Sequence, residues 1–189
     1  MSLLTALARF SNFELENLLL RPFSYEDLDS FYHMVSSEEN IPFLFPPLST
    51  KTEAEELFVA SFLREPLGTW AIVQKVNHEL IGAIRFEKIV EGKMQAELGY
   101  FLNKNYWGQG IMTQVVQNLV YLSFYHLELQ ELVIVTHLEN KASQRVAQKA
   151  GFRRFRQYKG SDRYTHQVRD YLSFRLARKE YHLEEDLLE

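Results

Sequence analysis

The alternation of hydrophobic and polar positions divides the chain into helical and extended segments. Apolar spacings of three and four, together with capping residues, predict helices over residues 25–35, 52–62, 112–124 and 140–150. Shorter apolar runs bounded by turn residues predict strands at residues 14–21, 69–76, 80–89, 95–102, 131–137, 152–158 and 168–176. Hairpins come first and a strand-helix-strand-helix order follows, which favours one mixed sheet with helices on both faces.

Capping residues mark where these helices begin and end. Ser24 is expected to cap the first helix, with acidic residues in its first turn. The sequence Thr52-Glu53-Ala54-Glu55 is predicted to be the capping box of the second helix. Gly151 follows the last helix at the position where a left-handed backbone commonly ends it.

Composition and charge mainly exclude certain classes of protein and of functional site. The 189 residues suffice for one domain with a real core, and 46% of them are hydrophobic, as in folded proteins. The net charge of −4 argues against a general nucleic-acid binder, so any anion site must be local. The lack of cysteine excludes disulfides, thiol nucleophiles and thiolate metal sites, and the six histidines show no metal-ligand spacing. No signal peptide or bilayer-spanning run is recognisable, so we expect a cytoplasmic protein.

The segment between the strand at 95–102 and the following helix carries two glycines, Gly108 and Gly110. The first N–H groups of a helix have no internal partner, and the helix dipole places partial positive charge there. Glycines let the backbone approach a bulky anion, so this turn is a candidate phosphate cradle that needs no lysine. Alternatively, the glycines only close a loop. The turn has neither the Lys-Ser/Thr pair of a Walker loop nor the third glycine of a dinucleotide loop.

This turn resembles the cofactor motif of the GNAT acetyltransferases, an Arg/Gln-x-x-Gly-x-Gly/Ala sequence that binds the pyrophosphate of acetyl-CoA. Trp107 falls at the Arg/Gln position, Gly110 at the first glycine and Met112 at the Gly/Ala position, so two of three positions depart from the pattern. The run Tyr-Trp-Gly-Gln-Gly-Ile-Met-Thr is nevertheless similar to the Rim-type branch of ribosomal-protein N-terminal acetyltransferases. The resemblance implies cofactor contacts from Phe101, Leu102, Trp107, Gly108, Gln109, Gly110, Ile111, Met112 and Thr113.

A second motif lies on the predicted helix 140–150. Asn140 and Ser143, followed by Ala-Gly-Phe at 150–152, resemble the Asn-x-x-Ser and Ala-Gly-Phe signature of the same family. The resemblance implies that Asn140 binds the pantetheine arm or ties two splayed strands together, and that Ser143 lies near the thioester sulfur or the CoA chain. Taken alone, Asn140 reads as an N-cap and Ser143 as an exposed helix residue. The resemblance covers roughly residues 18–176.

Acetyl transfer to an amine requires a base, donors for the oxyanion and a proton for the leaving thiolate. Glu97 is the first candidate base, because strand alternation places it on one face with Gly99 and Phe101, and burial of that face would raise its pKa. Alternatively, Glu97 points to solvent. By analogy with Rim-type members, Ser143 is the candidate proton donor. Asp162 is a further candidate base at about the spacing those members show, although an exposed loop aspartate is the more ordinary interpretation.

Two groups of side chains have open assignments. One basic cluster either holds the 3′-phosphate of CoA or an acidic partner, or forms a solvated strand face; it comprises Arg153, Arg154, Arg156, Lys159 and Arg163. The aromatic loop at residues 41–48 either covers the acceptor or packs against the second helix, through Phe43, Phe45 and Pro46.

The sequence therefore predicts an α/β (α+β) protein: a single GNAT-type domain over residues 1–189, with a core at about 14–177, an acidic tail at 182–189 and a mixed, mostly antiparallel sheet of six to seven strands. Acetyl-CoA is expected between the strands at 95–102 and 132–137, and its acetyl group passes directly to a primary amine without a metal. The resemblance favours a protein N-terminus, such as that of a ribosomal protein. A small-molecule amine, or CoA binding without turnover, is the alternative. We expect a monomer or homodimer with no nucleic-acid or membrane partner.

Overall fold

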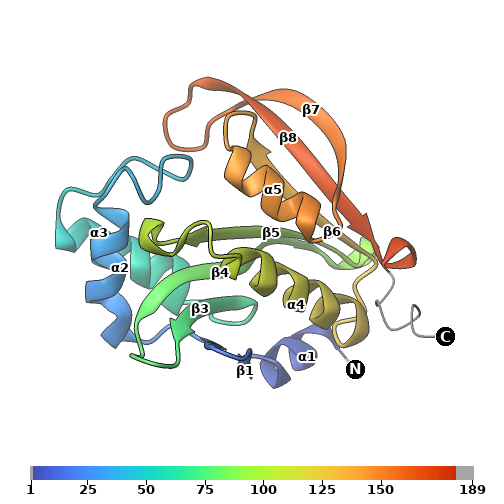
Figure 1. Cartoon of the computed structure of the whole chain (residues 1–189), viewed down its shortest axis with the longest axis horizontal. Helices are drawn as coiled ribbons and strands as arrows, with labels where there is room; N and C mark the ends of the chain where they lie inside the picture. The colour runs from blue at the N-terminus through green and yellow to red at the C-terminus, as the bar shows by residue number, and fades with distance from the viewer. Residues whose placement is uncertain (1, 182–189) are drawn as a thin grey trace. The chain divides into compact units, whose positions relative to one another are not determined.

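The secondary structure follows the predicted order of elements. The computed structural model describes residues 2–181, so the predicted acidic tail at 182–189 lies outside the described residues. The α-helices are α1 (Leu3–Arg9), α2 (Leu28–Val35), α3 (Lys51–Phe58), α4 (Ile111–Tyr125) and α5 (Lys141–Lys149) (Figure 1). The strands are β1 (Phe13–Glu14), β2 (Leu18–Arg21), β3 (Thr69–Gln74), β4 (Leu80–Val90), β5 (Gln95–Leu102), β6 (Glu131–His137), β7 (Arg153–Ser161) and β8 (Val168–Ala177). Within residues 2–181, no helix has the length and apolar character needed to span a bilayer.

The strands form one eight-stranded sheet in the order β1-β2-β3-β4-β5-β6-β8-β7. Strands β1 to β4 pair as antiparallel neighbours, β5 and β6 pair in parallel, and β6 and β8 pair antiparallel. The predicted mixed, mostly antiparallel sheet is confirmed. It has eight strands because the first predicted strand is in fact two.

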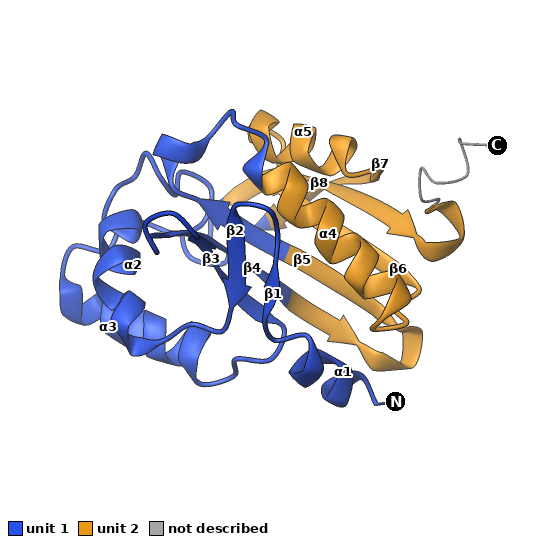
Figure 2. Cartoon of the chain, turned by 60° about the horizontal axis from the view of Figure 1, so that its bottom comes forward, with its two compact units in different colours: residues 1–86, 99–111, 161–167 blue, residues 87–98, 112–160, 168–189 orange. Residues whose placement is uncertain are grey.

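The described chain divides into two compact units, coloured separately in Figure 2. Unit 1 comprises residues up to 86, 99–111 and 161–167. Unit 2 comprises residues 87–98, 112–160 and the described residues from 168 on. The glycine-bearing turn therefore belongs to unit 1, and the motif around Asn140 belongs to unit 2. The single domain over the whole chain stays a prediction.

Phenylalanines fill the core of unit 1. Phe31 and Phe58 are fully buried, and their ring centroids lie 4.9 Å apart. Burying one such side chain contributes about 1.5–3 kcal/mol. Phe45 is partly buried against the same cluster, and its ring centroid lies 5.6 Å from that of Tyr164. For Phe45, the structure therefore shows the packing alternative for the aromatic loop.

The first predicted strand is wrong in detail. Residues 14–21 form a hairpin, because the backbone N–H of Leu15 donates to the carbonyl oxygen of Leu18 at 2.9 Å and reverses the chain. The pairing of Phe13 with Leu20 then defines β1 and β2. The reversal occurs at Glu16 and Asn17, where the asparagine is a weak turn signal without a glycine or proline beside it.

The predicted start of the second long helix is also wrong. The N-cap is Thr50, whose hydroxyl oxygen accepts from the N–H of Glu53 at 3.2 Å while the Glu53 carboxylate accepts from the N–H of Thr50 at 3.1 Å. The capping box therefore pairs Thr50 with Glu53, two residues earlier than the predicted pair of Thr52 and Glu55. The predicted cap at Ser24 is confirmed: its hydroxyl oxygen accepts from the N–H of Glu26 at 3.2 Å.

The helix α1 has no counterpart among the sequence predictions. It buries only Ala6 and Leu7, so its apolar periodicity is weak. The segment that follows α1 contacts β3 through Trp70, whose side chain is 0% exposed and whose indole Nε1 donates to the carbonyl oxygen of Phe10 at 3.1 Å.

Gly82 marks a close approach of β4 to β5. A Cβ atom at this position would lie 2.4 Å from the carbonyl oxygen of Phe101 and 3.1 Å from the Cα of Leu102, so a strand backbone would have to move. Overpacking of this kind costs about 1–3 kcal/mol. We expect Gly82→Ala to lower Tm by about 2–12 °C in a circular-dichroism melt, using roughly 2–4 °C per kcal/mol for a protein of this size. Gly92→Ala is the matched control, because a Cβ there meets no atom within 4 Å. Equal Tm values for the two variants would contradict the close approach.

Candidate active site

The turn between β5 and α4 is held by side chains that bond to its own backbone. The indole Nε1 of Trp107 donates to the carbonyl oxygen of Leu102 at 2.7 Å. The amide Nε2 of Gln109 donates to the carbonyl oxygen of Asn105 at 3.1 Å. The side chain at the Arg/Gln position of the motif therefore shapes the turn itself.

Gly108 and Gly110 give this turn its backbone path. Their φ angles are 76° and 79°, in the left-handed region that favours glycine. A Cβ atom added at either position meets no protein atom within 4 Å, and the 15-residue helix α4 begins directly afterwards at Ile111. Open space beside a glycine backbone, followed by the unpaired N–H groups of a helix start, suits a diphosphate. The residues of the turn fit the pyrophosphate of acetyl-CoA.

The predicted cofactor residues divide by exposure. Trp107, Gly108, Gln109 and Gly110 are exposed, whereas Ile111 and Thr113 are half-buried. The side chains of Leu102 and Met112 are buried, and Phe101 packs beside Phe31 with ring centroids 6.5 Å apart. These three residues have mainly backbone groups to offer a ligand. The methionine at the Gly/Ala position of the motif is part of the buried stripe of α4.

The second motif begins with a helix cap. The Oδ1 atom of Asn140 accepts from the backbone N–H of Ser143 at 3.0 Å, so Asn140 is the N-cap of α5. Ser143 is half-buried and not exposed. Gln144, which the sequence analysis missed, donates from Nε2 to the carbonyl oxygen of Leu138 at 2.8 Å and so ties α5 to the end of β6. Cofactor contacts by Asn140 and Ser143, and a site shared with the Gly108–Gly110 turn, stay predictions.

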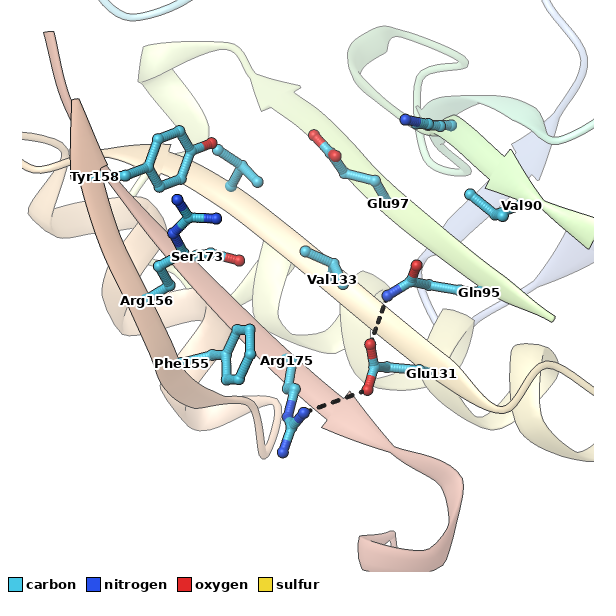
Figure 3. Close-up of a pocket in the computed structure, with 12 residues that line it drawn as sticks. Val90, Gln95, Glu97, Glu131, Val133, Phe155, Arg156, Tyr158, Ser173 and Arg175 are labelled. Atoms are coloured by element: carbon cyan, nitrogen blue, oxygen red, sulfur yellow. Dashed lines mark hydrogen bonds and ion pairs between the residues drawn. The ribbon is translucent and has the colours of Figure 1, made fainter. Parts of the chain in front are cut away.

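A pocket of about 290 Å³ lies on the sheet of unit 2 (Figure 3). Helices α4 and α5 lie on one face of these strands (Figures 1 and 2), where Leu132 and Ile134 of β6 are buried. Strand alternation places the pocket on the opposite face. Its lining residues are Lys88, Val90, Gln95, Glu97, Glu131, Val133, Val135, Phe155, Arg156, Tyr158, Ser173 and Arg175.

Glu97 lines this pocket from β5. It pairs with Val133 of β6, which in turn pairs with Arg175 of β8, so the three residues form one row across the sheet. Burial, with a smaller contribution from the charge of Glu87, raises the pKa of Glu97, while Lys88 acts in the opposite direction. The half-buried carboxylate faces the pocket rather than bulk solvent. Its catalytic role stays a prediction.

Tyr158 lies within electrostatic reach of Glu97. Burial and the charge of Glu97 raise the pKa of the Tyr158 hydroxyl, and the charge of Arg156 lowers it. Figure 3 shows Glu97 on β5 at one side of the pocket and Tyr158 and Arg156 on β7 at the other side. The sequence analysis missed Tyr158 as a site residue, because its position opposite Glu97 depends on strand order.

Polar side chains also meet at the other end of the pocket. The amide Nε2 of Gln95 donates to Oε1 of Glu131 at 2.5 Å, and an Nη atom of Arg175 lies 3.7 Å from Oε2 of the same carboxylate. The Arg175 guanidinium lies 4.4 Å above the ring centroid of Phe155. None of these four residues was predicted. The available signal was the alternation of polar residues on β5, β6 and β8, which points to a common face only once the register is known.

Asp162 differs from its expected environment. It was expected to be an exposed loop residue, but its side chain is only 9% exposed. Its Oδ1 atom accepts from the backbone N–H groups of Tyr164 and Thr165 at 3.0 and 2.7 Å and from the Thr165 hydroxyl at 2.8 Å. The carboxylate is buried because it caps the turn between β7 and β8. Its assignment as a base stays a prediction, and this geometry gives it a structural role.

Comparison with known proteins identifies the family. The family model described as the acetyltransferase (GNAT) domain matches residues 17–153. An uncharacterised N-acetyltransferase of Bacillus subtilis (strain 168), YoaA, is 26% identical over 156 residues, which cover 79% of this chain and 88% of that protein. The ribosomal-protein-serine acetyltransferase of Escherichia coli (strain K12) is 39% identical over only 74 residues, which cover 39% of this chain and 41% of that protein.

A solved structure supports the fold. The structure of RimL, a ribosomal L7/L12 alpha-N-protein acetyltransferase in complex with coenzyme A, superposes with a TM-score of 0.75 at 21% identity, covering 86% of this chain and 95% of that one. Because the matched family model spans most of the chain, this protein belongs to the GNAT family and is an acetyl-CoA-dependent N-acetyltransferase.

Proposed function

We propose that the acceptor is the α-amine of a protein N-terminus, and that Glu97 is the base. The observation that carries this proposal is a half-buried carboxylate in the pocket of unit 2, to which no group of residues 2–181 donates a hydrogen bond. A carboxylate in that environment holds a proton more readily than an exposed one. It is therefore suited to take a proton from an acceptor amine.

The basicity of the acceptor favours an α-amine. An N-terminal amine has a pKa of about 7.7–8.0, against about 10.4 for lysine. At pH 7 roughly a tenth of α-amines are neutral, but fewer than a thousandth of lysine amines are. A carboxylate is a modest base, so an acceptor that is already partly neutral suits it better.

The roles of the chain's own residues follow from their positions. The turn at Gly108–Gly110 and the first N–H groups of α4 would hold the pyrophosphate of acetyl-CoA, which supplies the thioester. Glu97 takes the proton of the acceptor nitrogen as that nitrogen bonds to the thioester carbonyl carbon. The hydroxyl of Ser143 supplies a proton to the sulfur as the carbon–sulfur bond breaks. Solvent then returns a proton to Ser143 and takes the proton from Glu97, which restores both groups. Ribosomal proteins are the acceptors named for two of the similar proteins, which supports the same class here.

The test is a comparison of two matched peptides. One has a free serine N-terminus and no lysine, and the other has a blocked N-terminus and one internal lysine. With purified protein and acetyl-CoA, we expect mass spectrometry to find one acetyl group on the α-amine of the first peptide and none on the second. Acetylation of small amines alone would favour the small-molecule alternative. Coenzyme A binding without thiol release from any amine would favour a protein that binds without turnover.

A further inference from the structure

The pocket of unit 2 has a positively charged wall opposite Glu97. Arg156 lies on β7, at the end of the strand order β5-β6-β8-β7 that begins with the strand of Glu97. Figure 3 shows both side chains at the same pocket, one from each side. Three inter-strand spacings of about 4.8 Å separate their strands, roughly 14 Å along the sheet. The carboxylate and the guanidinium lie closer together than the two strands, because each side chain extends into the pocket from its own side.

Two other charged residues of the pocket, Glu131 and Arg175, are matched with each other, and Lys88 acts on Glu97. Glu131 accepts from Gln95 and lies 3.7 Å from Arg175, so its carboxylate and that guanidinium offset each other. Arg156 has no such match: no carboxylate of residues 2–181 forms an ion pair with it. Its charge is therefore available to a ligand.

The side-chain conformation of Arg156 is suited to binding a carboxylate. Its guanidinium carbon lies 5.1 Å from the ring centroid of Tyr158. A guanidinium over an aromatic ring keeps its N–H groups in one plane at its edge, where a carboxylate can accept two of them. The pocket wall also includes Ser173, whose hydroxyl can donate. In this arrangement an amine of the ligand can bind beside Glu97, and an anionic group of the same ligand can bind beside Arg156.

We infer that the acceptor carries a carboxylate a few bonds from its reactive amine, and that Arg156 binds this carboxylate while Glu97 faces the amine. This inference rests on the proposed function, because it takes the pocket of unit 2 as the acceptor site. Two sources supply the same chemistry: a peptide with an acidic second residue, and a free amino acid with its α-carboxylate. The volume of about 290 Å³ is close to the lower end of the range for small-ligand pockets, about 300–1,000 Å³, and admits either.

The test measures kcat/KM for matched acceptors that differ by one charge. The peptide arm compares Ser-Asp-Ala-Ala-Tyr amide with Ser-Asn-Ala-Ala-Tyr amide. The small-molecule arm compares serine with serinamide. We expect the wild-type protein to prefer the acid of at least one pair by about tenfold, because a hydrogen bond to a charged group strengthens binding and the exposure of this arginine limits the gain. The arm that shows the preference identifies the source of the carboxylate.

Variants of β7 decide whether Arg156 is responsible. Arg156→Gln should reduce the ratio of kcat/KM for the acidic acceptor over its amide to about one. Arg156→Glu should disfavour the acidic acceptor and favour a peptide with lysine at the second position. Arg153→Gln removes the same charge from an exposed residue of the same strand outside the pocket, and should retain the wild-type preference. Two variants at position 156 keep the test informative if one fails to fold.

The outcomes separate the two proposals. Equal kcat/KM within both pairs, with acetylation still occurring, would overturn the inference and leave the acetylation of α-amines standing. The same preference in wild type and Arg156→Gln would also overturn it. Failure to acetylate any amine would overturn the proposed function, and the inference with it.

Discussion

Replacing Gly110 with aspartate is expected to weaken coenzyme A binding by about 100-fold. The new side chain would occupy the open space beside a backbone with a φ of 79°, and would bring a negative charge to the helix start that is proposed to hold a diphosphate. A 100-fold change corresponds to about 2.7 kcal/mol. Isothermal titration calorimetry with coenzyme A measures it directly.

Two controls isolate the cause of that loss. Gly92→Asp adds the same side chain and charge at another exposed glycine whose Cβ would meet no atom within 4 Å. We expect it to bind coenzyme A like the wild type. Gly110→Ala imposes the same left-handed backbone strain as Gly110→Asp but adds no charge. Its Kd for coenzyme A should therefore fall between those of the wild type and Gly110→Asp. If Gly110→Asp bound coenzyme A with wild-type affinity, the cofactor would have to be held elsewhere.

Replacing Glu97 with glutamine is expected to lower kcat at pH 7 by about 100-fold, the lower end of the effect of a general base. Because burial raises the pKa of Glu97, the wild-type activity should rise with pH through a value above the ordinary carboxyl pKa of about 4.3. Other charged groups at this pocket are Lys88, Glu131, Arg156 and Arg175, with Glu87 acting from outside it. The variant should lose this limb of the pH profile and retain its Kd for coenzyme A. Full activity across pH would show that the base lies elsewhere, and Asp162→Asn would then be examined.

Glu97→Gln is expected to lower activity but to raise thermal stability. A carboxyl pKa that is higher in the folded than in the unfolded state means that the folded protein binds the proton more tightly. Stability contributed by this group therefore falls as pH rises from the ordinary value through the raised one. At pH 7 the ionised Glu97 is a small cost, so Glu97→Gln should raise Tm slightly while it lowers kcat. Glu91→Gln, at an exposed residue outside the pocket, is the matched control and should change neither.

Features that depend on neighbouring residues could be predicted from the sequence. Gly108 and Gly110 adopt the left-handed backbone that their place between a strand and a helix suggests. Asn140 caps α5, and Gly151 follows it with a φ of 90°. Each of these features is determined within a few residues of chain, so no knowledge of strand order is needed.

The pocket of unit 2 could be predicted only in part. Glu97 was a candidate from the alternation of its own strand. Arg156 and Ser173 come from strands far along the chain, and they reach the pocket only because β8 lies between β6 and β7. A period of two shows which residues share a strand face, but it does not show which strand is the neighbour.

Errors occurred where a polar side chain bonds to backbone. Thr50 and Thr52 both precede acidic residues, and only the bond between Thr50 and Glu53 shows which of them begins α3. Asp162 belongs to a loop by its sequence, yet three hydrogen bonds within its own turn bury it. In both cases the sequence shows which residues are able to cap but does not show which geometry they adopt.

The two tryptophans of the chain give the protein an internal fluorescent reporter. Trp70 is 0% exposed in the core of unit 1, so its emission should be blue-shifted and should change only when the protein unfolds. Trp107 is 41% exposed at the turn that would bind the pyrophosphate, so its red-shifted emission should respond to a ligand at that turn. One emission spectrum therefore separates occupation of the turn from loss of the fold, and Trp107→Phe would leave only the signal of the fold.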